Sequence, residues 1–220
     1  MDSAEQPQVL SVEGMALPPM AIRLPRGMHA IEVSLDETER TAAVEQLVRD
    51  IYPRGEVPLW QAMSALYSAS ALEMLSAGVS FFGIGLYDIE DGGGVAHCSL
   101  TVAVFESGEV EQDTVAQGIF ALLSDPLRDV TWLDLPCGPA VSAISFRKLV
   151  IDGQYTKSGK DEELSMGQMQ VHIPFSTGPY TAVITLDTAS VEQWEEFTHA
   201  MAGIVTSLEF PMDDSERVTR

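Results

Sequence analysis

Residues 172–210 read HIPFSTGPYTAVITLDTASVEQWEEFTHAMAGIVTSLEF, and this stretch decides the fold. Two runs of strand-forming residues, 171–175 and 180–187, flank a Ser-Thr-Gly-Pro turn, which predicts a β-hairpin. A helix is predicted next, because Ser190 and Gln193 have capping-box spacing and apolar residues then recur every three or four positions. Those apolar positions are Val191, Trp194, Phe197, Met201, Ile204, Val205 and Leu208. A hairpin followed by an amphipathic helix is typical of the α+β class, an antiparallel sheet with helices packed on it.

The preceding residues repeat the same two patterns. Asp36 is a favourable N-cap for a first helix, which Pro53 ends, and Pro58 occupies the favoured first turn of a second helix that reaches residue 77. Further runs predict one more helix at 112–123 and strands at 20–24, 79–89, 95–106, 130–135 and 140–151.

Domain organisation follows from the absence of any Gly-, Ser- or Pro-rich linker between the predicted elements. We expect a single α+β domain over residues 19–210, built as an antiparallel sheet flanked by helices. Polar segments at 1–18 and 211–220 are expected to be flexible tails.

The charge balance is strongly acidic, with 33 acidic and 12 basic residues and a formal net charge of −21. Such a chain is repelled by phosphate backbones and anionic lipid surfaces, so we expect neither nucleic acid nor membrane as a partner. The sequence has no apolar run long enough to span a membrane and its first residues lack the pattern of a signal peptide, which predicts a cytoplasmic protein. Cys98 and Cys137 lie far apart without metal-binding spacing, which predicts reduced thiols.

The second predicted helix is almost free of charge, since Glu73 is the only charged residue between positions 57 and 87. A helix without a charged face is either buried on both sides, here between the sheet and the neighbouring helices, or covers another molecule. The second explanation predicts self-association, such as a homodimer, or a protein partner. The residues expected at that interface are Trp60, Met63, Leu66, Tyr67 and Met74.

Three motifs have the residue types of a catalytic or metal site but not the full pattern. Glu196 and His199 have the Glu-x-x-His spacing of a metal ligand pair, but di-metal bundles need a second copy and two more glutamates. Ser145 and Lys148 have Ser-x-x-Lys spacing, but they fall in a predicted strand, where positions i and i+3 face opposite sides. The acidic run at 88–97 lacks the order of a calcium loop. We therefore predict no metal, no cofactor and no catalytic residue, although dispersed residues can still converge in space.

A second functional hypothesis is a small-molecule-binding protein, or an unrecognised hydrolase, with a pocket between the sheet and the helices. Such a site needs a concave surface on which a few polar groups converge. The polar residues expected to line it are His97, Asp134, Tyr155 and His172.

Two stretches carry a resemblance to a known group of proteins. The LPCGPAV segment at 135–141, which opens a long strand, resembles a hairpin of uncharacterised actinobacterial proteins of the Mog1p/PsbP-like class. The closing stretch, with Pro174, the strand at 180–186, Trp194 and the SLEF sequence at 207–210, is similar to their usual ending. The resemblance implies an antiparallel sheet sandwiched between helices and carries over no catalytic residue.

Members of this wider class act as non-catalytic partners of other proteins, among them a small-GTPase cofactor and a photosystem extrinsic subunit. Together with the uncharged helix and the incomplete motifs, the resemblance favours one hypothesis. The expected function is a non-enzymatic cytoplasmic interaction protein, an adaptor or chaperone-like partner.

Overall fold

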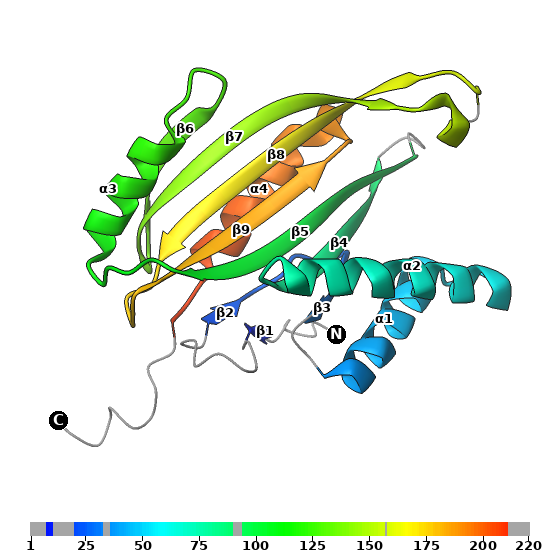
Figure 1. Cartoon of the computed structure of the whole chain (residues 1–220), viewed down its shortest axis with the longest axis horizontal. Coiled ribbons are helices and arrows are strands. Elements are labelled where there is room, and N and C mark those ends of the chain that lie inside the picture. The colour runs from blue at the N-terminus through cyan, green and yellow to red at the C-terminus, as the bar shows by residue number, and fades with distance from the viewer. Residues whose placement is uncertain (1–7, 11–19, 33–35, 90–93, 157, 211–220) are drawn as a thin grey trace.

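The computed structural model describes residues 8–10, 20–32, 36–89, 94–156 and 158–210, without the side chains of 8–10, 30–32 and 155. Within these ranges a seven-stranded antiparallel sheet has the order β3-β4-β5-β9-β8-β7-β6 (Figure 1). Its strands are β3 (Met28–Glu32), β4 (Val79–Ile89), β5 (Gly94–Glu106), β6 (Asp129–Leu135), β7 (Gly138–Ile151), β8 (Glu162–Pro174) and β9 (Tyr180–Thr188). β9 pairs with both β5 and β8, so the last strand lies in the middle of the sheet.

One face of the sheet, which we call the core face, is covered by α4 (Trp194–Thr206) (Figure 1). The helix buries the apolar residues whose spacing predicted it, among them Phe197, Met201 and Ile204. They belong to one hydrophobic cluster with the inward side chains of β5, β8 and β9 and with β2 (Met20–Ile22). β2 pairs with β1 (Gln8–Leu10).

The opposite face, which we call the second face, carries the other three α-helices of the described ranges. α1 (Glu37–Ile51) and α2 (Val57–Ser76) form a separate hydrophobic cluster with Phe82 of β4. α3 (Gln112–Leu123) packs over β6, β7 and β8 at the other end of the sheet, and its Ala116 is fully buried. In Figure 1 α2 and α3 lie on opposite sides of the middle strands β5 and β9.

The α+β class and the antiparallel sheet with helices are confirmed by this arrangement. The N-cap at Asp36 is also confirmed, because its side chain accepts the backbone N–H groups of Thr38 and Glu39 at 2.8 and 2.9 Å. Each predicted helix is present within two residues of its expected start, apart from the last.

The capping box at Ser190 is wrong. A 3₁₀ turn, η3 (Val191–Gln193), precedes α4, so the helix begins at Trp194 and the Ser190 side chain makes no cap hydrogen bond. Its hydroxyl instead accepts the backbone N–H of His97 at 3.1 Å and ties the end of β9 to β5.

Burial of α2 on both sides is also wrong. α2 packs on one side only, against α1 and β4, and Ala71 is its one fully buried residue. Leu66 and Leu72 are 55% and 54% exposed on its outer side. No helix in the described ranges is long and apolar enough to cross a membrane.

Candidate functional site

A groove of about 690 Å³ lies on the second face, between α3 and the C-terminal end of α2. Its floor is the middle of the sheet, where β5, β9 and β8 run side by side. The volume lies within the usual range of sites for small organic molecules, roughly 300–1,000 Å³.

The floor consists of outward-facing side chains in two rows across the three strands. Side chains alternate between the faces of a strand, so the apolar residues between these positions point into the core under α4. In the first row Thr101 lies opposite Thr185, which lies opposite Gln170; in the second, Ala103, Val183 and His172 have the same relation.

Apolar side chains of α3 form one wall, with Val115, Ile119 and Leu122 directed at the groove. Phe105 closes the floor at one end; it is 49% exposed and Leu122 is 83% exposed. Gly118 also lines this wall, and a Cβ built there would meet nothing within 4 Å. The side of the groove next to α3 therefore has free space and presents apolar surface to a ligand.

The position of α3 is fixed by hydrogen bonds at its first turn. Gln112 donates its side-chain N–H to the carbonyl oxygens of Pro174, at 2.7 Å, and Cys137, at 3.3 Å. The Glu111 side chain caps the helix by accepting the backbone N–H of Thr114. The wall is thus tied to the end of β8 that forms part of the floor.

Two polar atoms beside the groove have no hydrogen-bond partner, although they are buried. They are Nε2 of His172 and Oγ1 of Thr181, and both residues line the groove. An unpaired buried polar group typically costs about 1–3 kcal/mol of stability. Burial, followed by the charge of Arg128, lowers the pKa of His172 below its ordinary 6.5, so its imidazole is neutral at pH 7.

Charge is confined to one end of the groove. Among the described residues that line it, only Glu106 and Glu109 are charged. Glu109 accepts the backbone N–H groups of Val110 and Glu111 through one carboxylate oxygen, which holds it in its own loop. The floor itself is uncharged, although the chain carries a net charge of −21.

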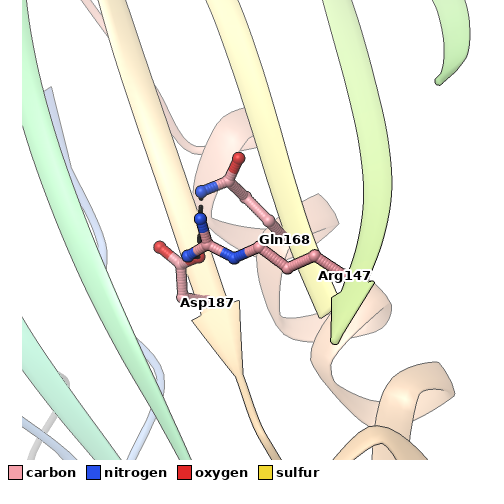
Figure 2. A network of polar contacts seen from close by, with 3 residues as sticks. All are labelled: Arg147, Gln168 and Asp187. Atoms are coloured by element: carbon pink, nitrogen blue, oxygen red, sulfur yellow. Dashed lines mark hydrogen bonds and ion pairs between the residues drawn. The ribbon is translucent and has the colours of Figure 1, made fainter. Parts of the chain in front are cut away.

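A polar network lies one row further along the same strands. Figure 2 shows Arg147, Gln168 and Asp187 meeting on the face of the sheet that is turned away from α4. Gln168 Nε2 donates to Asp187 Oδ1 at 2.9 Å, and Arg147 Nη2 lies 3.7 Å from the same oxygen. The guanidinium and the carboxylate therefore compensate each other's charge.

Of the four residues predicted for a ligand pocket, His172 alone lines this groove. His97 is on the same face of β5 but beyond Thr101, exposed, with Nδ1 3.4 Å from Ser190 Oγ. Asp134 lies on β6, where its carboxylate accepts the indole N–H of Trp132 at 3.1 Å. Tyr155 is in the short 3₁₀ turn η2 (Gly153–Tyr155), and its side chain lies outside the described part of the structure.

Thr181, Thr185 and Gln170 were missed in the sequence. Threonine is an ordinary strand residue and glutamine an ordinary surface residue, so neither stands out. One signal in the sequence could have indicated them. They alternate with apolar residues in strands whose apolar face is already covered by the predicted last helix.

Four of the five predicted interface residues are half-buried on the side of α2 that faces the molecule. Trp60, Met63, Tyr67 and Met74 pack against the cluster beneath α2, and Trp60 donates its indole N–H to the carbonyl of Tyr52 at 2.9 Å. Leu66 is on the outer face. The other large apolar side chains exposed on α2 are Val57, Leu59, Leu72 and Leu75.

The incomplete motifs do not assemble into a site. No three metal-binding side chains come together among the described residues. His199 and Glu196 are exposed on α4, and Lys148 pairs with Glu163 at 2.8 Å. Of the acidic run at 88–97, residues 90–93 lie outside the described ranges.

Both cysteines are free thiols; Cys98 is buried and Cys137 half-buried. Burial raises the pKa of Cys98 to about 11, so it is protonated and a poor nucleophile at pH 7. Cys98 borders Tyr87, whose hydroxyl has no hydrogen-bond partner and whose pKa burial raises to about 12. A smaller cavity of about 420 Å³ lies there, between β4 and α4.

No protein-family model matches the chain, and no curated protein is similar to it in sequence. Among solved structures, one similar chain is a crystal structure of a protein from Bacteroides thetaiotaomicron, with 11% identity and a TM-score of 0.32. The match covers 60% of this chain and 46% of that one. At this level of similarity the match supports no conclusion about function.

Proposed function

We propose that this protein is a non-enzymatic binding protein that holds a small, mainly apolar molecule in the groove on the second face. One observation carries the proposal: no helix of the described residues covers the middle of the sheet, which forms the floor of a groove of about 690 Å³ with apolar walls. An exposed apolar surface of this kind is characteristic of a binding site. The incomplete catalytic motifs favour binding over catalysis.

The proposal can be tested with a substitution that fills part of the groove and leaves its walls in place. Gly118→Leu places a side chain in the open space beside α3, and glycine is a poor helix former, so the helix should tolerate it. The matched control is Gly203→Leu on α4, which is exposed and equally free of neighbours, but lies outside the groove.

The probe is diphenylhexatriene, a hydrocarbon that fluoresces when it leaves water. We expect saturable binding to the wild type and to Gly203→Leu, and at least about tenfold weaker binding to Gly118→Leu, because a leucine side chain occupies the probe's volume. Equal binding to both variants, or none to the wild type, contradicts the proposal.

A second candidate function is interaction through α2, which the exposed leucines favour. We propose a second copy of the chain as the partner. Leu66 lies at the middle of this 20-residue helix, so an antiparallel pair centred on it places the two Glu73 carboxylates about 20 Å apart along the axis. That exceeds the screening length of about 8 Å at physiological salt, so two acidic chains can meet there without close repulsion.

Light scattering across a concentration series tests this second candidate. We expect a mass twice that of the 23.9 kDa chain at high concentration, and a monomer for Leu66→Glu. Ala42→Glu on the exposed side of α1 is the control and should leave the dimer intact. A wild type that stays monomeric refutes self-association.

The finer family assignment is also a proposal. We infer a Mog1p/PsbP-like arrangement from the LPCGPAV hairpin and the closing stretch, and a cytoplasmic location from the two free cysteines, which fit a reducing compartment. An experimental structure compared with members of that class tests the first, and fractionation of the host cell tests the second.

A further inference from the structure

We propose that His172 and Thr181 together form a hydrogen-bonding anchor for an uncharged hydroxyl or carbonyl group on an otherwise apolar ligand. This inference rests on the proposed function, because it names the class of molecule that the groove would hold.

The two residues are placed to act on one ligand atom. β8 and β9 are antiparallel neighbours, with His172 opposite Val183 and Thr181 opposite Pro174. Thr181 is therefore the diagonal neighbour of His172 on the same face, a relation that places Cα atoms roughly 7–8 Å apart. Side chains at that separation can reach a common atom between them.

Both groups are available for such a bond. His172 Nε2 and Thr181 Oγ1 are the unpaired buried atoms that border the groove, whereas most buried polar groups in proteins are paired. Neighbouring atoms cover them in the empty groove. Rotation of Thr181 about its Cα–Cβ bond exchanges hydroxyl and methyl between staggered positions, and a half-turn of the imidazole moves Nε2 in the same way.

The surrounding charge selects an uncharged group. A carboxylate would enter beside Glu106 and Glu109 and against a net charge of −21. The charge of Arg128 reaches His172, but no lysine or arginine is among the described residues that line the groove. An ammonium group would find no carboxylate on the floor of the groove. A hydroxyl both donates and accepts, and it therefore suits a neutral imidazole and a threonine hydroxyl in either orientation.

The experiment compares head groups on one chain length. 1-Decanol, decanoate and decylamine are each titrated as competitors of diphenylhexatriene, which has no polar atom and reports the apolar groove alone. We expect 1-decanol to displace the probe at concentrations at least about tenfold lower than the other two. Tighter binding of decylamine would assign the anchor to Glu106 and Glu109 and overturn the proposal. Tighter binding of decanoate would also overturn it.

Two variants then assign the anchor. Thr181→Val and His172→Phe should each weaken the binding of 1-decanol by about three- to tenfold, because one hydrogen bond is lost. The affinity for the hydrocarbon probe should change by no more than about twofold. Thr131→Val, exposed on the edge strand β6 and outside the groove, is the control and should change neither. Probe binding with no head-group preference refutes the anchor alone, whereas failure of the probe to bind refutes the proposed function itself.

Discussion

The two faces of β5, β9 and β8 are built from alternate residues of the same strands, yet they have opposite character. On the core face, Leu100, Ile184 and Ile173 are fully buried beneath α4. One position away, Thr101, Thr185 and His172 face the groove. Over these three strands the core face carries continuous apolar burial, which drives folding, whereas the second face presents polar side chains to the groove. The difference indicates that the strands hold the fold with one face and are free to bind with the other.

The largest expected effect comes from truncating a buried side chain on the core face. Ile184→Ala should lower the free energy of unfolding by about 3–4 kcal/mol, because a fully buried isoleucine leaves a cavity. Val183→Ala, the next residue but on the second face, should cost no more than about 1 kcal/mol, because Val183 is half-buried beside open space. Urea unfolding of both variants measures the contrast. Equal losses would mean that the groove is packed rather than open.

A smaller effect of opposite sign is expected at Thr181. Replacing its unpaired hydroxyl by the methyl group of valine should raise the free energy of unfolding by about 1 kcal/mol, because the residue is 94% buried without a hydrogen bond. The half-buried Thr185→Val should stay within about 0.5 kcal/mol of the wild type. A destabilised Thr181→Val would show that its hydroxyl is bonded in the folded protein, and the two faces would then differ less than proposed.

The contrast between the faces was only partly predictable. The spacing of Phe197, Met201 and Ile204 predicts both α4 and its buried side, because helical periodicity is a local property. The groove depends on β9 lying between β5 and β8, and β5 and β9 are separated by more than 70 residues. Local patterns do not determine such long-range pairing, so Thr101 and Thr185 could not be brought together beforehand.

Strand β8 was predicted only in part, and β3 was missed, as was β1 within the segment expected to be a tail. The predicted strand at 171–175 is only the apolar end of β8, which begins at Glu162. Its first residues are polar because they continue the long β7–β8 hairpin, where one side meets solvent. β3 is a five-residue edge strand, and short edge strands carry little hydrophobic signal.

The smallest expected effect is the pH dependence that His172 adds to the second face. Its pKa is lowered in the folded protein, first by burial and then by Arg128, so the unfolded chain binds more protons below the ordinary value of 6.5. Stability should therefore fall as the pH drops from about 6.5 through the lowered pKa, with no contribution from this group above that window.

His172→Phe should reduce the loss of unfolding free energy between pH 7.5 and pH 5.5, measured by urea titration at each pH. The exposed His199→Gln on α4 is the control and should keep the wild-type loss. If His172→Phe shows the same loss as the wild type, the imidazole is protonated as easily in the folded as in the unfolded chain. Water would then reach His172, and the ligand would be bound to it through a water molecule rather than directly.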